Sequence, residues 1–317
     1  MSETFGDVTA EYLAIRTAAG LVIGSHDLVA VQGPDAASFL QGIVSQDIEA
    51  LPEGGVGRSL LLGPEGKLRA LLWVLKGEDE VILVTDAGRG EGLAADLGRY
   101  LFRVDAVVEP LRLKVIGVLG PGAGSVLTQA NLPKPVGWVR SGSRLVANLP
   151  LGGLARFIVV GADQEELVAA GGRLAGSLAA DAVRVEAGEP VMGRDLDEKT
   201  IPQESGLVPE TVSFTKGCYL GQELVARIDS RGHVNRVLRG VVIGTNVLPP
   251  EGAGLLIDEN PVGRLTSIAE SLTLRAPVGL ALVRREVEPR SSVEIRWEQG
   301  SAAGTVQQLP LSDFTES

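Results

Sequence analysis

The chain has 317 residues, of which 44 % are hydrophobic and 22 % charged, and its formal net charge at pH 7 is −11. This length favours two or three globular domains, and the negative charge disfavours direct binding to nucleic-acid backbones. The single cysteine excludes an internal disulfide, and with only two histidines beside it the chain carries neither a complete iron–sulfur ligand set nor a recognisable zinc pattern.

The N-terminal stretch MSETFGDVTAEYLAIR carries acidic residues early and contains no apolar run. It therefore lacks the pattern of a signal peptide. No part of the chain has the roughly 18 uninterrupted apolar residues that a membrane span requires. We expect no membrane association and a location in the reducing cytoplasm.

The stretch LVAVQGPDAASFLQGI, residues 28–43, predicts a strand, a Gly-Pro turn and a helix. An apolar run stops at Gly-Pro, and small and apolar residues then recur at helical spacing. Downstream, RSLLLGPEGKLRALLWVL predicts a hairpin that turns at Pro64 to Gly66, EVILVTD a strand, and AGRGEGLAADLGRYL a helix. We place a first α+β domain at residues 1–110.

The same order recurs in the middle of the chain. LKVIGVLGPGAGSVLTQA, residues 113–130, again predicts strand, Gly-Pro turn and helix. ARFIVVG predicts a strand, and DQEELVAAGGRLAGSLA predicts one helix with Asp163 as its N-cap. Two such units indicate a pair of related antiparallel-sheet α+β domains, although Gly-Pro after a strand also recurs by chance. We place the second domain at residues 111–235, and the N-terminal residues are candidates to pack with it.

The stretch VRVEAGEPVMGRDLDEKTIPQESGL, residues 183–207, is rich in acids and interrupted by prolines. Arg184 and Glu186 alternate with two valines, which predicts a strand that turns both polar side chains to one face. If that face lines a cavity, the carboxylate could accept paired N–H groups from a heterocycle. If it faces solvent, the pair has no special meaning.

The only cysteine lies in SFTKGCYLGQELVAR, residues 213–227. Gly217 and Gly221 permit backbone angles that other residues resist, and the residues after Gly221 have helical spacing, so Cys218 is expected on a loop leading into a helix N-terminus. The partial positive charge of that terminus, together with Lys216, favours a thiolate, whereas Glu223 opposes it. Glu223 and Arg227 stand at the i,i+4 spacing of a helix ion pair.

Two other interpretations of Cys218 remain open at this point. A free cysteine is often a small buried apolar residue. A hydrolase-type nucleophile is disfavoured, because such a cysteine needs a base and no histidine is near it in the sequence.

From Val237 onward, short apolar runs alternate with turn residues, and no helical pattern separates them. Regular short strands of this kind predict a small antiparallel barrel. We therefore place a third, β-barrel domain at residues 236–317.

The segment KGCYLGQE, residues 216–223, resembles the K-G-C-[YF]-x-G-Q-E signature of the YgfZ family. These are folate-binding proteins related to the T-protein (aminomethyltransferase) of the glycine cleavage system. VRVEAGEPVMGRDLDE and GPDAASFLQGIVSQDI also resemble stretches of the wider superfamily. The resemblance spans nearly the whole chain, and it is loose from about residue 78 to residue 180.

The resemblance implies two related α+β domains and a C-terminal β-barrel around a central tetrahydrofolate channel. It further implies a cytoplasmic accessory role in the assembly or repair of iron–sulfur proteins, including radical enzymes that modify tRNA. Those client proteins would be the partners, with transient contact to an iron–sulfur cluster and no direct contact with nucleic acid.

The same resemblance assigns roles to individual residues. Cys218 would be the functional residue, and Glu186 would meet the pterin ring of the folate. Arg227 is a weaker candidate for binding folate or a partner surface, and Arg184 is a further candidate for binding folate. The signature loop that presents the thiol would comprise Lys216, Gly217, Tyr219, Gly221, Gln222 and Glu223.

One departure from the enzyme branch bears on activity. Aminomethyltransferases carry an aspartate pair after the glycine hairpin, and Arg69 and Ala70 stand there in this chain. Without a carboxylate to orient the folate nitrogen, aminomethyl transfer by that route is not expected. A one-carbon transferase therefore remains the alternative function, and a non-catalytic interaction protein with an inert thiol is a third.

Overall fold

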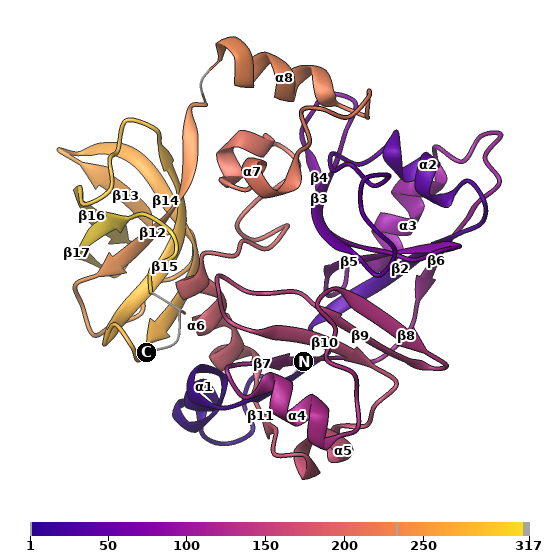
Figure 1. Ribbon diagram of the computed structural model, residues 1–317. Helices are drawn as coiled ribbons and strands as arrows, with labels where there is room; N and C mark the ends of the chain where they lie inside the picture. The colour runs from indigo at the N-terminus through magenta and orange to yellow at the C-terminus, as the bar shows by residue number, and fades with distance from the viewer. Residues whose placement is uncertain (1, 233, 313–317) are drawn as a thin grey trace.

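The computed structural model describes residues 2–232 and 234–312. A five-stranded sheet, a six-stranded sheet and a closed six-stranded barrel surround the middle of the molecule (Figure 1). The predicted fold class, two related α+β units with antiparallel sheets plus a C-terminal barrel, is confirmed. No helix among the described residues combines the length and apolar character needed to cross a bilayer.

The first α+β unit contains β2 (His26–Gln32), α2 (Ala36–Gln41), β3 (Val56–Leu62), β4 (Leu68–Lys76), β5 (Glu80–Asp86), α3 (Gly90–Gly98) and β6 (Val107–Leu111). Its antiparallel sheet has the order β3-β4-β5-β2-β6, and the predicted hairpin joins β3 to β4. Helices α2 and α3 cover one face, where Phe39, Leu40 and Leu93 join the apolar core.

The second α+β unit contains β7 (Val115–Leu119), α4 (Ala123–Gln129), β8 (Trp138–Ser141), β9 (Arg144–Asn148), β10 (Arg156–Val160), α5 (Gln164–Ala169) and β11 (Arg173–Leu174). Its sheet has the order β11-β1-β7-β10-β9-β8. The run β8-β9-β10-β7 repeats the run β3-β4-β5-β2 of the first unit. Strand β1 (Gly20–Ile23) from the N-terminal part is inserted between β7 and β11, pairing parallel with β11.

The helix predicted from Asp163 onward is wrong in its extent. The chain forms the short helix α5, then β11, and then helix α6 (Ser177–Ala187). The break falls at Gly171 and Gly172: Gly171 has a φ of +95°, and a Cβ on Gly172 would lie 2.8 Å from the side chain of Leu21. Close packing on β1 therefore outweighs helix continuation. Asp163 occupies the N-cap position, but its side chain makes no capping hydrogen bond.

The strand predicted for Arg184 and Glu186 is also wrong, because both residues lie on α6. The alanines of SLAADAVRVEA favour a helix, and Gly188 ends it with a left-handed φ of +75°. Residues two apart on a helix point about 200° apart. Arg184 and Glu186 therefore do not share a face.

Helix α1 (Val8–Thr17) packs against α6, and the N-cap Asp7 accepts a hydrogen bond from the Ala10 amide. After α6 the chain continues through η1 (Pro202–Ser205), α7 (Val208–Thr211) and α8 (Gln222–Arg231). Figure 1 shows α8 bridging from the first unit toward the barrel. The apolar cluster around α6 includes residues of α1, of β3 and β4, and of the barrel, so it joins the three bodies.

The barrel is formed by β12 (Arg236–Ile243), β13 (Gly254–Ile257), β14 (Asn260–Ser271), β15 (Ala276–Arg284), β16 (Ser292–Trp297) and β17 (Gly300–Gln307). It closes in the order β12-β15-β14-β13-β16-β17 around its own apolar core. The division of the chain into domains at residues 110 and 235 stays a prediction.

Candidate functional site

Cys218 is exposed on the loop between α7 and α8. Backbone hydrogen bonds fasten this loop to the segment after α2: the Ser213 amide donates to the Ser45 carbonyl at 3.0 Å, and the Leu220 amide donates to the Gly42 carbonyl at 3.1 Å. The thiol is therefore presented to solvent from a loop whose two ends are anchored on the first α+β unit.

Lys216 adds a second fastening close to the thiol. Its Nζ donates to the carbonyls of Val44 at 2.9 Å and Gln46 at 2.7 Å. Burial lowers the pKa of this ammonium to about 8, although the carboxylates of Asp47 and Glu49 act in the opposite sense. The ammonium is thus committed to backbone carbonyls, and its proposed effect on a Cys218 thiolate stays a prediction.

The glycine at position 221 is required by close packing. Its φ is +76°, and a Cβ there would lie 2.5 Å from the Gly63 carbonyl oxygen at the β3–β4 hairpin. Gly217, in contrast, has no atom within 4 Å of its would-be Cβ. Tyr219 is buried, burial raises its pKa to about 12, and its amide donates to the Gln222 side chain at 3.3 Å.

Arg227 is exposed on α8, and so is Glu223. Although both side chains are described, no ion pair joins them in the structure, so the expected i,i+4 pair is not formed. On the same helix, Leu224 and Ile228 are half-buried and Val225 is fully buried.

Glu186 lies in the opposite kind of environment, because its side chain is completely buried. Its Oε1 accepts a hydrogen bond from the Tyr12 hydroxyl at 2.7 Å. Its Oε2 lies 3.4 Å from the Ser312 hydroxyl and 3.8 Å from the Arg16 guanidinium. These contacts include neither Cys218 nor Arg227, so the structure does not bring these two residues together with Glu186.

A pterin ring at Glu186 would place two N–H donors beside this carboxylate. Both oxygens already accept hydrogen bonds, and the side chain has no exposed surface. In this conformation the pterin therefore does not fit at Glu186.

Arg184, on the other side of α6, is fully engaged with protein groups. Its Nη1 donates to Asp195 at 2.9 Å and to the Glu189 carbonyl at 2.7 Å, and its Nη2 donates to Ser267 on β14 at 2.7 Å. Its Nε donates to Asp181 at 2.8 Å. These bonds tie α6 to the barrel, and a role of Arg184 in binding folate stays a prediction.

At the position of the missing aspartate pair, Arg69 is held by ion pairs and Ala70 is buried in the first unit. The Arg69 guanidinium bonds Asp96 at 3.0 Å and Glu198 at 2.8 Å. A guanidinium cannot accept a proton or a hydrogen bond from a folate nitrogen. The structure thus provides no acid–base group from these two positions.

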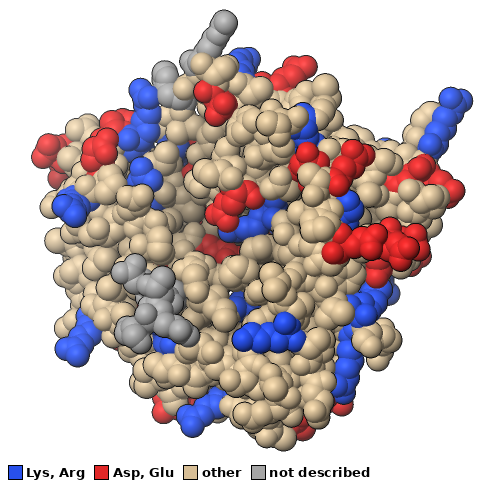
Figure 2. Space-filling model, in the orientation of Figure 1, with Lys and Arg blue, Asp and Glu red and all other residues tan. Residues whose placement is uncertain are grey.

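A central group of charged residues around Trp73 was missed by sequence reasoning. A cavity of about 20 Å³, large enough only for water, is lined by Trp73, His26, Asp86, Glu189 and Arg58 among others. Charged side chains of both signs are visible in the middle of the face in Figure 2. His26 and Asp86 are cross-strand partners on β2 and β5, so a register argument could have paired them.

Burial dominates the protonation of this group. It lowers the pKa of His26 to about 3 and raises the pKa of Asp86 to about 6. Burial would also raise the pKa of Glu189, but Arg156 and Arg58 beside it hold that pKa below its usual range. The Arg58 guanidinium lies 5.1 Å from the centre of the Trp73 ring.

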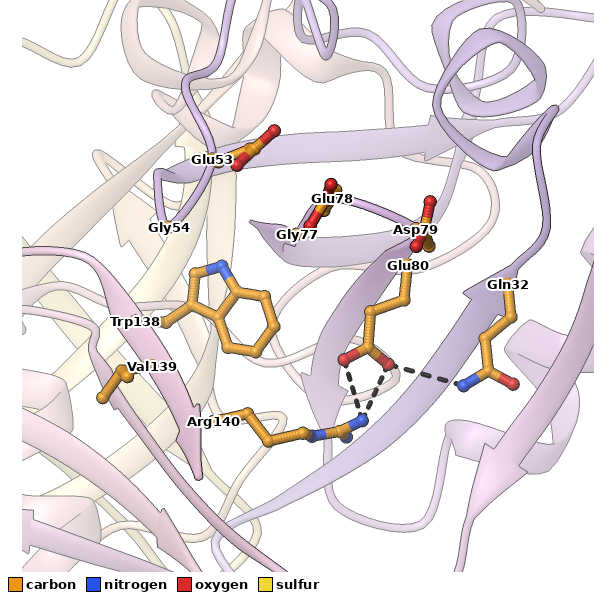
Figure 3. Close-up of a pocket in the computed structure, with 10 residues that line it drawn as sticks. All are labelled: Gln32, Glu53, Gly54, Gly77, Glu78, Asp79, Glu80, Trp138, Val139 and Arg140. Carbon is orange, nitrogen blue, oxygen red and sulfur yellow. Dashed lines mark hydrogen bonds and ion pairs between the residues drawn. The ribbon is translucent and has the colours of Figure 1, made fainter. Parts of the chain in front are cut away.

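A second, open pocket of about 650 Å³ lies between the 77–80 turn of the first unit and β8 of the second (Figure 3). Glu80 bonds Arg140 at 2.8 Å and Gln32 at 3.5 Å, and the Trp138 indole donates to the Lys76 carbonyl. These side chains bond protein partners across the two sheets. Among the described residues, no group of three or more His, Cys, Asp or Glu is arranged to hold a metal.

Comparison with known proteins covers most of the chain. Residues 1–136 match the GCVT N-terminal domain, and residues 236–313 match the glycine cleavage T-protein C-terminal barrel domain. The chain is 30 % identical to an aminomethyltransferase of Rubrobacter xylanophilus, over 93 % of this chain and 84 % of the relative. It is also 30 % identical to an aminomethyltransferase of Thermus thermophilus, over 94 % of this chain and 89 % of the relative.

The same relationship appears in three dimensions. The crystal structure of the glycine cleavage system aminomethyltransferase T from Bartonella henselae superposes with a TM-score of 0.89 at 25 % identity. The match covers 96 % of this chain and 89 % of that one. The arrangement of two α+β units and a barrel is therefore shared along nearly the whole length of both proteins.

Proposed function

Because this chain belongs to the glycine cleavage T-protein (aminomethyltransferase) family, we propose that it is a folate-binding protein of the YgfZ type. In this role it serves the assembly or repair of iron–sulfur proteins, among them radical enzymes that modify tRNA, and it acts in the cytoplasm. The observation that carries the proposal is the exposed Cys218 within KGCYLGQE, on a loop fastened to the first α+β unit.

The position of Cys218 suits a reaction with another macromolecule. Because the thiol is exposed on an anchored loop, a client protein can contact Cys218 without any unfolding of that loop. One cysteine can ligate a cluster only if the client or a small thiol supplies the remaining ligands. Two chemical roles are therefore open to it. One is transient cluster contact. The other is a mixed disulfide, formed when the Cys218 thiolate attacks a disulfide of a client and displaces one of the client's sulfurs as a thiolate.

In the proposed function, tetrahydrofolate would bind through Glu186, with Arg227 and Arg184 as further candidate contacts. As a bound group, the folate would supply one-carbon chemistry or a binding signal. In the described conformation the carboxylate of Glu186 is already satisfied, so binding requires its present partners to move.

The test is replacement of Cys218 in a host that lacks the native protein. Cys218→Ala should lower the activities of iron–sulfur enzymes, most strongly under oxidative stress. Thr215→Ala, an exposed change on the same loop, is the matched control and should behave as wild type. Wild-type activities in Cys218→Ala at normal protein levels would remove the role assigned to this thiol.

A second candidate function is aminomethyl transfer on tetrahydrofolate. It is favoured by the relatives named aminomethyltransferase, and it is disfavoured by Arg69 and Ala70 at the positions of the aspartate pair. Incubation with methylene-tetrahydrofolate, ammonia and an aminomethyl carrier protein distinguishes the two. Turnover above background would support the transferase. No turnover, together with lowered iron–sulfur enzyme activities in the Cys218→Ala host, would support the accessory factor.

A further inference from the structure

The two sheets of the molecule meet at strand β8, which is the edge strand of the six-stranded sheet. The Trp138 amide of β8 donates to the Gly54 carbonyl at 2.9 Å, and the Gly54 amide donates to the Lys76 carbonyl at the end of β4 at 2.8 Å. The open pocket of about 650 Å³ lies beside this contact, and Trp138, Val139 and Arg140 of β8 line it (Figure 3). Beyond Trp138, the edge of β8 therefore borders an open space.

The register of β8 shows which of its backbone groups point to this edge. Opposite residues of antiparallel strands alternate between pairs that exchange hydrogen bonds and pairs that do not. The Gly137 carbonyl accepts from the Asn148 amide at the end of β9 at 2.8 Å, so the alternation turns the backbone groups of Trp138 and Arg140 away from β9. The bond from the Trp138 amide to Gly54 has this outward direction.

Three of the outward groups on β8 are open. They are the Trp138 carbonyl and the N–H and carbonyl of Arg140, none of which bonds another group within residues 2–232 and 234–312. A Cβ on Gly54 would lie 3.5 Å from the Trp138 carbonyl, so the glycine leaves that oxygen uncovered. One donor and two acceptors along a strand edge form a template on which an extended peptide adds as a further strand.

The charge of the pocket indicates what kind of peptide fits. Four carboxylates line it, those of Glu53, Glu78, Asp79 and Glu80, against the single guanidinium of Arg140. Arg140 is already paired with Glu80 at 2.8 Å. The other three carboxylates belong to exposed side chains, and none of them forms an ion pair within the described part of the chain. Lysine or arginine side chains of a bound peptide would supply the missing cations.

Trp138 gives the pocket a rigid apolar wall. Its side chain is 8 % exposed, and its indole N–H donates to the Lys76 carbonyl at 2.8 Å. The ring also packs on Gly77, where a Cβ would lie 3.1 Å from it. The aliphatic stem of a lysine or arginine can pack on such a wall while its charged end reaches the carboxylates.

The same charges argue against a second copy of this chain as the occupant. Pairing two β8 edges would bring two acidic pockets together, and like charges across an interface disfavour association. We propose that β8 and the pocket beside it dock an extended segment of another protein that carries lysine or arginine residues and adds to β8 as a further strand. This surface is independent of the roles proposed for Cys218 and Glu186.

The backbone part of the proposal is tested by two variants at one position. The probe is a fluorescent, capped peptide of about seven residues in which lysine and arginine alternate with valine, and its anisotropy gives the Kd. Arg140→Pro deletes the outward N–H but no bond to β9, and an edge strand tolerates such a proline. It should weaken binding by about ten-fold, although it also removes a positive charge. Arg140→Ala removes the same charge but keeps the N–H, and it should bind the peptide at least as tightly as wild type.

The charge part is tested by two pairs of substitutions. Glu78→Lys with Asp79→Lys should weaken binding of the same peptide by about ten-fold. Glu270→Lys with Glu288→Lys makes the same change of net charge at exposed positions of the barrel and should leave the Kd nearly unchanged. Thermal melts check that all of these variants are folded.

Each part can be overturned separately. Equal Kd values for Arg140→Pro and Arg140→Ala would overturn the strand pairing, and equal Kd values for the two lysine pairs would overturn the role of the acidic pocket. Failure of the basic peptide to bind wild type, or equal binding of a peptide with glutamate in place of lysine and arginine, would overturn the whole proposal. A wild-type dimer in sedimentation that Arg140→Pro abolishes would overturn it in favour of a second copy of the chain.

Discussion

Cys218 and Glu186 are the two residues to which the sequence assigns the central roles, and the folded chain places them in opposite environments. Cys218 is exposed on a loop that backbone bonds hold against the first unit. Glu186 is fully buried between α1, the barrel and the C-terminal segment. A partner can therefore meet the thiol in the described conformation, whereas a ligand can meet the carboxylate only after a local rearrangement. The proposed contact with a client and the proposed binding of folate would in this respect be separate events.

The largest expected effect is a difference in accessibility between the two regions. In native protein, Cys218 should react with N-ethylmaleimide nearly as fast as in urea-unfolded protein. A cysteine placed beside Glu186, Ser312→Cys in a Cys218→Ser background, should react about 100-fold more slowly than Cys218, because position 312 is buried and the thiol reacts only after local opening. Equal rates of reaction with N-ethylmaleimide at positions 218 and 312 would contradict the expected difference in accessibility.

The anchoring of the Cys218 loop can be broken at Gly221. Gly221→Ala should lower the free energy of unfolding by about 2–3 kcal/mol, because the residue has a positive φ and its Cβ would collide with the Gly63 carbonyl. Gly217→Ala is the matched control in the same loop, and its effect should stay within about 0.5 kcal/mol. Urea unfolding measures both, and a larger loss in the Gly217 variant would contradict the assigned packing.

A third expected effect concerns His26, which is half-buried and lines the small cavity beside Trp73. Burial lowers the folded pKa of His26 to about 3, whereas an unfolded imidazole titrates near pH 6.5. Between these two pKa values, the unfolded state therefore binds a proton at His26 that the folded state does not bind. The contribution of His26 to the free energy of unfolding is complete above about pH 6.5 and is lost as the pH falls toward 3.

Asp86 acts in the opposite direction over part of this range, because its raised pKa of about 6 lets the folded state hold a proton longer. A comparison with His26→Gln isolates the histidine. Between pH 7 and pH 5 the wild type should lose about 2 kcal/mol more unfolding free energy than this variant. Parallel pH profiles from urea unfolding would contradict the lowered pKa, because they would show that His26 has the same pKa in the folded and unfolded states.

The smallest expected effect is on the affinity of the enclosed site. Glu186→Gln keeps the shape of the side chain but replaces one accepting oxygen by an amide that donates. Tetrahydrofolate should bind about ten-fold more weakly to this variant in calorimetry. Cys218→Ser should leave that affinity unchanged, because the two residues share no contact. Unchanged affinity in Glu186→Gln would refute the proposed pterin contact.

Much of the fold could be predicted because its signals are local. Short apolar runs bounded by turn residues predicted the barrel strands and, in the two sheets, β2, β3, β4, β5, β7 and β10. Gly-Pro marked the same strand–helix turn at Gly33 and Gly120. The segment after Gly217 was expected to be a loop entering a helix, and α8 begins directly after Gly221. Such signals predict the local structure correctly because they depend only on residues that are close in the sequence.

Local signals failed where distant residues decide the outcome. Val183 and Val185 alternate with polar residues as in a strand, whereas the alanines before them favour a helix. The local signals conflict, and α6 is a helix whose apolar residues pack with α1 and the barrel. The break at Gly172 depends on Leu21, far away in the sequence. The group around Trp73 unites residues from β2, β3, β4 and β5 with Glu189, and no single stretch could reveal it.

The sequence by itself determined the family resemblance, the two α+β units with their barrel, and a glycine-bounded loop that carries the only thiol. Only the tertiary structure decided that this thiol is exposed and that the carboxylate of Glu186 is enclosed by Tyr12 and Ser312. The physical reason is that strand period and turn chemistry act over a few residues, whereas burial depends on which remote segments come to rest on a side chain. For Glu186 those segments come from the two ends of the chain.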